Sequence, residues 1–329
     1  MPKRIEALKR WLEDELDFSE YTLNPASSDA SFRRYFRVTH DVASYIVMDA
    51  PPDRDDTRPF VSVDRLLFDV GLNVPEIIDE NPEEGYLLLG DLGSSLYLNV
   101  LNGDNVERLY GDALAALAAI QICRPGDGVL PPYDRELLMT EMQLFRDWLV
   151  GKHLGIELPG ADANALASAF DLLADNALAQ PQVVVHRDYH SRNLMVTESN
   201  NPGIIDFQDA VIGPVTYDLV SLLRDCYIRW PRKRVEEWAL GYQELALQSG
   251  ILREEHEDPA QFLRWFDLMG VQRHLKAAGI FARLNHRDGK PAYLGDIPRT
   301  LGYVVEVSGR YADLGALGEF VSERVLARL

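Results

Sequence analysis

The chain has little cysteine, a deficit of positive charge and no long apolar run. Its two cysteines, Cys123 and Cys226, exclude a disulfide-based scaffold and indicate a reducing compartment. Lysine and arginine number 33 against 52 aspartate and glutamate, a net charge of −19, so binding to nucleic acid or anionic membranes is not expected. No apolar run approaches the roughly 18 residues that a spanning helix needs. We therefore expect a cytoplasmic protein with no nucleic-acid, membrane or obligate protein partner.

The 329 residues are 47% hydrophobic, enough for a large core divided between two lobes. Up to Gly90, short strand patterns alternate with amphipathic helices. Beyond residue 105, apolar residues recur at helical spacing, as at Leu109, Ala113 and Leu117. This order predicts an α+β fold with a small β-rich N-terminal lobe, residues 1–90, and a larger, mostly helical C-terminal lobe, residues 91–329.

The most informative stretch is a polar loop between short apolar runs. Residues 183–185 are all valine and predict a buried strand that ends at residue 186. Two further apolar runs, 194–196 and 204–205, flank a Ser-Asn-Asn-Pro-Gly turn, which is typical of a hairpin. The polar residues between these runs are therefore expected on a loop that buried strands hold in place.

Three oxygen-bearing side chains of this stretch, Asp188, Asn193 and Asp206, are expected to converge. Such donors suit Mg²⁺, which proteins usually hold with one or two carboxylates and the phosphates of a substrate. The spacing His-x-Asp with Asn five positions after the Asp is also that of the kinase catalytic loop. Asp188 is then the base that accepts the proton of the attacking hydroxyl, and Asn193 and Asp206 are the metal ligands.

Three motifs together resemble a known family: His186-x-Asp188-x-x-x-x-Asn193, Ile205-Asp206-Phe207 and Gly213-Pro214-x-x-x-Asp218. The family is that of the aminoglycoside phosphotransferases and choline kinases. The resemblance implies a two-lobed protein-kinase-like fold, ATP as co-substrate and Mg²⁺. The sequence of the catalytic core and of residues 270–300 is also similar to one subgroup, the bacterial kinases of cell-wall recycling, which phosphorylate the anomeric hydroxyl of N-acetylmuramate or N-acetylglucosamine. This implies an amino-sugar substrate.

The resemblance assigns nucleotide contacts in the first lobe. A small-residue turn near Ser31, followed by Arg33 and Arg34, corresponds to the hairpin that covers the phosphates, although an ordinary surface hairpin has the same pattern. Met48 stands where such kinases carry the phosphate-pairing lysine, and Phe60 stands near the place of its glutamate partner. Arg33 or Arg34 could supply the missing charge.

Other assignments fall around the link between the lobes and on the catalytic loop. The Leu89 carbonyl and the Asp91 amide correspond to the groups that bind adenine, but a glycine-flanked linker would look alike. His190 corresponds to a residue near the γ-phosphate and could also only pack. His186 is expected to shape the loop by hydrogen bonding.

Candidate acceptor contacts lie further along the chain. Asp218 begins a predicted helix and is expected to be structural, as a cap or brace. Asp225 lies on the same polar face and could touch the substrate. Arg224 and Trp230 are weaker candidates, since a Trp can stack on a sugar but usually packs. Arg273, with basic neighbours at positions 276 and 283, could attract the lactyl carboxylate of N-acetylmuramate. A solvated or acid-paired helix face is the alternative.

Two functions of other classes remain open from the residues. The methionine at position 48 is compatible with a nucleotide-binding protein without turnover. A metal-dependent hydrolase could be built on His186, Asp188, His190 and Asp206. Within the kinase interpretation, aminoglycoside, choline and homoserine are alternative acceptors.

Overall fold

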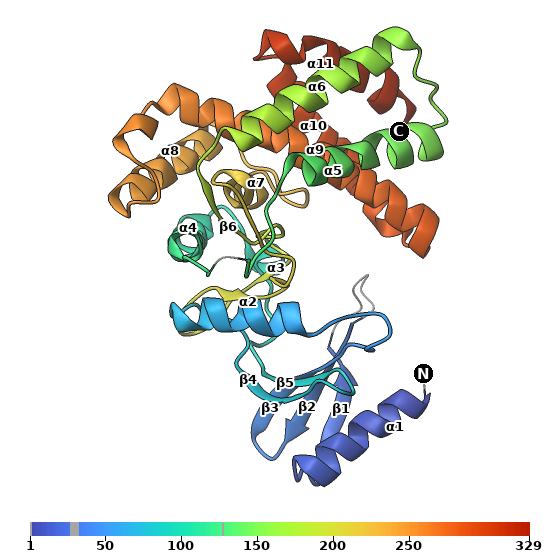
Figure 1. Ribbon diagram of the computed structural model, residues 1–329, viewed down its shortest axis with the longest axis vertical. Helices are drawn as coiled ribbons and strands as arrows, with labels where there is room; N and C mark the ends of the chain where they lie inside the picture. Colours follow the sequence, from blue (N-terminus) through green and yellow to red (C-terminus); the bar gives the residue numbers. More distant parts are fainter. Residues whose placement is uncertain (1, 27–32, 127) are drawn as a thin grey trace. The chain divides into compact units, whose positions relative to one another are not determined.

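The computed structural model describes residues 2–26, 33–126 and 128–329, and the chain divides into two compact units (Figure 1). Unit 1 comprises Met1–Ser95 and Met195–Asp209, and unit 2 comprises Leu96–Leu194 and Ala210–Leu329. The chain thus leaves unit 1, builds part of unit 2, returns to unit 1 for one short segment and then completes unit 2. The lobes proposed from the sequence, 1–90 and 91–329, do not include this return.

Unit 1 is built on a five-stranded sheet in the order β1-β2-β3-β5-β4, in which every neighbouring pair is antiparallel. The strands are β1 (Thr22–Pro25), β2 (Arg34–His40), β3 (Ala43–Asp49), β4 (Ile77–Asn81) and β5 (Tyr86–Gly90). The predicted strand pair on either side of residues 27–32 is confirmed by β1 and β2, whereas the turn itself, with Ser31, lies outside the described residues.

Successive side chains of each strand point to opposite faces of the sheet, so both faces carry apolar side chains that helices can cover. The N-terminal helix α1 (Pro2–Arg10) continues as a π-helical turn, η1 (Trp11–Glu15). Its apolar side forms a buried cluster with alternate residues of β2, β3 and β5: Leu8, Trp11, Leu12, Phe36, Val38, Val47, Tyr86 and Leu88. Figure 1 shows α1 and the helix α2 (Arg58–Asp69) on different sides of this sheet.

Two elements of unit 1 have well-defined limits. The strand β4 begins only at Ile77, since Pro75 has no amide hydrogen for a sheet bond. The helix α2 buries Phe60, Val63 and Leu67. Val70 is exposed, because the helix ends before it and Gly71 follows with φ +83°.

Helix α2 also buries an acid that the apolar pattern does not reveal. Asp64 is 2% exposed, and its Oδ2 has no hydrogen-bond partner among the described residues. Burial raises the pKa of Asp64 to about 7, and the charge of Arg65 only partly counteracts this. In the unfolded chain an aspartate titrates near 3.9. The folded state therefore holds a proton over this interval that the unfolded state has lost, and stability falls as the pH rises from about 4 to about 7.

We expect Asp64→Asn to raise the free energy of unfolding at pH 8 by about 2 kcal/mol or more, and to change it little at pH 4. The amide cannot ionise, so it avoids the cost of a buried carboxylate, for which a three-unit shift sets an upper bound of about 4 kcal/mol. Urea unfolding at both pH values measures the effect. Asp69→Asn, on the exposed end of the same helix, is the control and should change stability by the same small amount at both. If the difference in the free energy of unfolding between Asp64→Asn and the wild type is the same at pH 4 and at pH 8, the expectation is wrong.

Unit 2 is mainly helical, with one small two-stranded sheet. Its principal helices are α3 (Tyr97–Val100), α4 (Val106–Ile122), α5 (Arg135–Leu144), the π-helix η2 (Phe145–His153), α6 (Gly160–Leu178), α7 (Tyr217–Leu223), α8 (Arg232–Gln248), α9 (Pro259–Asp288), α10 (Ile297–Ser308) and α11 (Gly315–Phe320). Short helical turns, η3 (Glu254–His256), η4 (Pro291–Asp296), η5 (Ala312–Leu314), η6 (Val321–Val325) and η7 (Leu326–Arg328), join or end them. The apolar stripe predicted at Leu109, Ala113 and Leu117 is buried on α4. A second stripe, from Leu138 to Leu149 on α5 and η2, is buried as well.

Helix α9 is the central element of unit 2 (Figure 1). It is 30 residues long and packs against α5, α6, α7, α8, α10 and η2. Residues on every side of its middle turns are buried, which is typical of a helix surrounded by others. Polar residues of this stretch, including Arg273 and Lys276, are therefore buried as well. A solvated face, one of the alternatives for these side chains, is excluded.

The two-stranded sheet of unit 2 positions the polar loop. Strand β6 (Gln182–Val185) pairs antiparallel with β9 (Val211–Pro214), with Val185 opposite Val211. The valine run is buried, as predicted, and the strand ends immediately before His186. Past the loop, β7 (Leu194–Met195) and β8 (Gly203–Ile204) form the expected hairpin at the return of the chain to unit 1.

Two expectations from composition are also met. Cys123 and Cys226 are free and buried, so neither takes part in a disulfide. Over the described ranges, we find no helix with the length and apolar character needed to cross a membrane.

Candidate active site

The loop after β6 fixes the backbone of Asp188 from both sides. The Asp188 amide donates to His186 Nδ1 at 3.3 Å. Its carbonyl accepts bonds from the His190 amide and from Asn193 Nδ2, both at 3.0 Å. The side chain of Asp188 is partly exposed. The loop therefore holds the backbone in place and leaves the side chain accessible from outside.

A buried aspartate on α7 anchors the start of this loop. The Asp218 carboxylate accepts hydrogen bonds from the amides of His186 (2.6 Å) and Arg187 (3.0 Å). Arg187 has φ +76°, an unfavourable conformation for a side chain with a Cβ, and these bonds help to retain it. Burial raises the pKa of Asp218 to about 6. The geometry gives Asp218 a bracing role, since both carboxylate oxygens are turned to the loop backbone.

Positive charges surround the Asp188 carboxylate. Burial by itself would raise the pKa of Asp188, but the charges of Lys276 and Arg273, among others, outweigh it and hold the pKa below its ordinary value. Burial lowers the pKa of His190, so this imidazole is neutral at pH 7. Asp188 is therefore ionised at neutral pH, the state that a proton acceptor requires.

The acid Glu141, on α5, pairs with two of the basic side chains that act on Asp188, Lys276 and Arg187. Its Oε1 contacts Lys276 Nζ at 2.9 Å and Arg187 Nη2 at 2.5 Å, and its Oε2 accepts a hydrogen bond from the Tyr133 hydroxyl. Lys276 also donates to the Tyr217 hydroxyl at 2.9 Å. Pairing with an acid, the other alternative stated for the basic residues of this helix, is therefore observed for Lys276. Neither the strand pattern nor the loop motif signals Glu141, whose role depends on pairing across 135 positions with Lys276.

Asp225 joins the catalytic loop to the segment after α7. Its Oδ2 accepts bonds from the amide of Ser191, at 3.0 Å, and from the Ser191 hydroxyl, and its Oδ1 accepts the Tyr227 amide at 3.0 Å. The residue is 1% exposed. Both oxygens are therefore engaged within the protein, and the geometry gives Asp225 a bracing role like that of Asp218.

The other acceptor candidates lie in different surroundings. Arg224 is 2% exposed and pairs with Asp267 at 2.6 Å. Trp230 donates to the Tyr110 hydroxyl and packs in an aromatic cluster with Trp238. Arg273 is 5% exposed, and its Nη1 donates to the Cys226 thiol at 3.6 Å. Its Nε has no partner among the described residues.

The last member of the predicted set, Asp206, belongs to unit 1. Asp206 has φ +66°, its side chain is exposed, and its Oδ1 accepts a hydrogen bond from Gln208 Nε2 at 2.9 Å. The strand β8 ends at Ile204, so Asp206 lies beyond the end of the strand and not within it. The neighbouring Phe207 is buried and packs on Phe60 of α2, with ring centroids 4.8 Å apart.

The nucleotide-side candidates in unit 1 are paired with acids. Arg33 Nε lies 2.7 Å from Asp55 Oδ2. Arg34 pairs with Asp49, which is fully buried and also contacts Arg4 at 2.7 Å. Both arginines are therefore already paired with acids, and a phosphate would have to compete for them. Asp49 directly follows Met48, which is also buried.

The strand end proposed for adenine lies in the same unit. Leu89 is buried in β5, opposite Ile46 of β3. The Asp91 side chain pairs with Arg37 at 2.6 Å and accepts the Gly93 amide at 2.9 Å. These contacts fix the turn that follows β5.

The donor set fits a hard cation. Asn193 directs its nitrogen to the loop backbone, which places its Oδ1 on the opposite side of the amide group. An amide oxygen of this kind is a donor that Mg²⁺ accepts, and the carboxylate of Asp206, in unit 1, is of the preferred type as well. Over residues 2–26, 33–126 and 128–329, no three His, Cys, Asp or Glu side chains are grouped to hold a metal ion, so the zinc site of a hydrolase finds no support.

Comparison with known proteins bears out the resemblance drawn from the motifs. The family model described as "Phosphotransferase enzyme family" matches residues 22–291. A protein of Pseudomonas putida named N-acetylmuramate/N-acetylglucosamine kinase is 47% identical, over 97% of this chain and 96% of its own length. A protein of the same name from Pseudomonas aeruginosa is 51% identical, over 91% of this chain and 88% of its own.

Solved structures show the same fold at low identity. A choline kinase from Cryptosporidium parvum is 13% identical and superposes with a TM-score of 0.66, covering 95% of this chain and 98% of its own. An aminoglycoside 2'-phosphotransferase-IIIa in complex with GDP gives a TM-score of 0.65 at 13% identity, over 94% of this chain and 99% of its own. The predicted α+β, two-lobed, kinase-like fold is thereby confirmed.

Proposed function

We propose a sugar-kinase reaction for this chain, which belongs to the phosphotransferase enzyme family. The reaction is Mg·ATP-dependent transfer of the γ-phosphoryl group to the anomeric hydroxyl of N-acetylmuramate or N-acetylglucosamine, giving the sugar 1-phosphate. The observation that carries the proposal is the identity of 47% and 51% with two proteins named as kinases of these sugars, over most of each chain.

The geometry of the loop supports a chemical role for Asp188 in this reaction. Its ionised carboxylate, held by a fixed backbone, orients the sugar hydroxyl and accepts its proton as the oxygen attacks phosphorus. Asn193 and Asp206 would hold Mg²⁺ through an amide and a carboxylate oxygen. When bound, the ion supplies charge neutralisation for the phosphates of the nucleotide. His186, Asp218 and the rest of the loop network keep Asp188 in position, which is the main protein contribution in phosphoryl transfer.

The nucleotide side of the proposal rests on main-chain groups. The Leu89 carbonyl and the Asp91 amide would bind adenine, and Ser31, outside the described residues, would lie near the phosphates. The neutral His190 would donate to a γ-phosphate oxygen. Arg33 and Arg34 would serve this site only if the nucleotide competes with Asp55 and Asp49 for them.

A mass-spectrometric acceptor screen tests the function. The protein is incubated with Mg·ATP and N-acetylmuramate, N-acetylglucosamine, choline, homoserine or an aminoglycoside, and a phosphate adduct is sought. We expect adducts on the two amino sugars only. An adduct on another alcohol alone would support kinase activity but contradict the proposed acceptor. If ATP consumption with every acceptor is no higher than that of the Asp188→Asn control, a binding protein without turnover is favoured.

We expect Asp206→Asn to raise the Mg²⁺ concentration needed for half-maximal activity by at least about 10-fold. Loss of a contact that only orients a metal ligand already costs about 10- to 100-fold in affinity, and this change removes a charged donor. Initial rates over a Mg²⁺ titration at fixed ATP provide the measurement. Asp79→Asn, an exposed acid on β4, is the control and should leave the titration unchanged. A titration for Asp206→Asn that coincides with that of the wild type would remove Asp206 from the metal site.

A further inference from the structure

The basic side chains around the catalytic loop differ in their partners. Lys276 and Arg187 share the carboxylate of Glu141. Arg192 lies over two aromatic rings, with its guanidinium carbon 4.9 and 5.2 Å from their centroids, the rings of Tyr227 and Tyr293. Arg273 differs from all of these, because no carboxylate of the described residues forms an ion pair with it.

Arg273 is nevertheless almost entirely buried, with 5% of its surface exposed. Its Nη1 donates to the thiol of Cys226 at 3.6 Å, and a thiol is a weak acceptor. Its Nε has no hydrogen-bond partner within residues 2–26, 33–126 and 128–329. A guanidinium stays charged in proteins and carries five N–H donors, so a buried one without an acid is costly. Arg273 is therefore a site that an anionic ligand can neutralise.

One set of contacts links Arg273 to the last part of the catalytic loop. Its thiol partner, Cys226, directly follows Asp225 in the chain. Asp225 in turn accepts the Ser191 amide at 3.0 Å. The next residue of α9, His274, holds the helix to the end of α7 through a 2.8 Å hydrogen bond from its Nε2 to a backbone carbonyl. The position of Arg273 relative to the loop is thus fixed within unit 2.

A second set of contacts links the same turn of α9 to the start of the loop. Lys276, three residues after Arg273, lies 2.9 Å from Glu141, which also pairs with Arg187. Arg187 directly precedes Asp188. The two sets of contacts reach the loop on either side of Asp188, and the charges of Arg273 and Asp188 act on each other. An anion bound by Arg273 therefore lies beside the proton acceptor.

Two anionic groups are available in the proposed reaction, the transferred phosphoryl group and the lactyl carboxylate of N-acetylmuramate. The phosphoryl group becomes bonded to the hydroxyl that Asp188 deprotonates, so it is always next to Asp188. The carboxylate is attached at another carbon of the sugar and is absent from N-acetylglucosamine, the second sugar in the names of the relatives. A buried arginine reserved for the carboxylate would stay unpaired whenever the neutral sugar binds. The phosphoryl group serves with both sugars.

We infer that Arg273 is a catalytic residue that donates hydrogen bonds to the phosphoryl group during transfer and to the phosphate of the sugar 1-phosphate product. The inference rests on the proposed function. In that reaction the hydroxyl oxygen bonds to the γ-phosphorus, its proton passes to Asp188, and the bond to the departing ADP oxygen breaks with its electron pair. Arg273 keeps its protons and balances the negative charge on the phosphoryl oxygens. Arg273 is thereby assigned to a group that both sugars receive, in place of the lactyl carboxylate.

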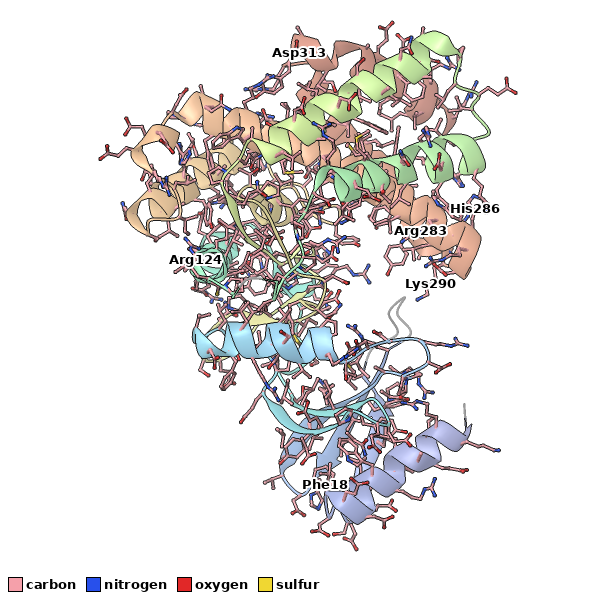
Figure 2. All side chains as sticks on the ribbon, viewed as in Figure 1. Phe18, Arg124, Arg283, His286, Lys290 and Asp313 are labelled. Carbon is pink, nitrogen blue, oxygen red and sulfur yellow. The ribbon has the colours of Figure 1, made fainter. Side chains whose placement is uncertain are left out.

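Kinetics with both sugars test this role. We expect Arg273→Met to lower kcat by about 10²- to 10³-fold with N-acetylmuramate and N-acetylglucosamine alike, the usual loss for one donor to developing charge, and to leave KM for each sugar near the wild-type value. Arg273→Lys, which keeps the charge without the planar fork, should recover part of the rate. The control is Arg124→Gln, an exposed arginine at the end of α4, which should keep the wild-type rate (Figure 2). A loss confined to N-acetylmuramate would assign Arg273 to the carboxylate and overturn the inference.

Binding of one sugar with and without its phosphate gives a second measurement. In calorimetric titrations, Arg273→Met should bind N-acetylglucosamine 1-phosphate about 10- to 100-fold more weakly than the wild type, the range for loss of a charged hydrogen bond. N-acetylglucosamine itself should bind equally to both proteins, which shows that the sugar site is intact. Equal affinities of the two proteins for the 1-phosphate would overturn the inference. A wild-type protein that phosphorylates neither sugar would instead overturn the proposed function.

Thermal unfolding separates this role from a structural one. Arg224, also on the side of α7 that meets α9, is 2% exposed and pairs with Asp267 at 2.6 Å. Arg224→Met breaks a buried ion pair and should lower the melting temperature by several degrees, whereas Arg273→Met breaks none and should leave it near the wild-type value. A fall as large in Arg273→Met as in Arg224→Met would give Arg273 a structural role and overturn the inference.

Discussion

Asp188→Asn is expected to lower kcat for sugar phosphorylation by about 10²- to 10⁴-fold, the usual contribution of a general base. The amide has nearly the same shape as the carboxylate but cannot accept the proton of the attacking hydroxyl. The backbone bonds of residue 188 to His186, His190 and Asn193 do not involve the side chain and are retained. The loss should therefore appear in the rate of transfer and leave nucleotide binding intact.

Steady-state kinetics and a separate measurement of ATP binding distinguish these effects. The control is Asp147→Asn, an exposed acid on η2 that pairs with the neighbouring Arg146. It should keep the wild-type rate. A rate for Asp188→Asn within about 10-fold of the wild type, with normal ATP binding, would remove Asp188 as the base.

Gly279→Ala is expected to cause the largest loss of stability among single methyl additions in α9, about 3 kcal/mol or more. A Cβ built on Gly279 would lie 2.3 Å from the carbonyl carbon of Leu144 and 2.4 Å from the amide nitrogen of Phe145. These are backbone atoms at the point where α5 passes into the π-helix η2, so they cannot rotate away as a side chain would. The two helices must separate to admit one methyl group.

Thermal unfolding measures this effect, with Gly241→Ala as the matched control. Gly241 is also inside a helix, α8, but a Cβ added to it would meet no atom within 4 Å, so alanine should stabilise the protein by up to about 1 kcal/mol. We expect the melting temperature to fall by several degrees in Gly279→Ala and to rise slightly in Gly241→Ala. Equal behaviour of the two variants would show that α9 and α5 are not in the close contact described. Because α9 carries Lys276, activity should fall together with stability in Gly279→Ala.

Local patterns predicted most of the elements that surround the catalytic loop. The valine run of β6, the hairpin after the loop and the apolar stripe of α4 each depend on residues close in sequence. The spacing of Asp188 and Asn193 was sufficient to place both on one loop. Such features are predictable because their physical cause lies within one strand, turn or helix.

Features that depend on distant pairing were not predictable. The sequence shows Lys276 as one basic residue on an amphipathic helix, whereas its burial follows from Glu141 and Tyr217 on other elements. The aromatic support of Arg192 likewise comes from residues 35 and 101 positions away, Tyr227 and Tyr293. The position of Asp206 beyond the end of β8 was not predictable for a different reason, since two isoleucines indicate a strand but do not indicate where it ends.

The return of residues 195–209 makes the first half of unit 2 an insertion into unit 1. Phe207, the ring partner of Phe60, reaches unit 1 only through this segment, as does the strand β8. On the ribosome, at about 5–20 residues per second, unit 1 must wait on the order of ten seconds after Ser95 for the piece that completes it. The amide of Val196 bonds to the carbonyl of Ser95 at 2.7 Å, so the points of exit and re-entry are neighbours. A shortened chain that joins Ser95 directly to Met195 should therefore close without strain, which would allow the sheet unit to be produced alone.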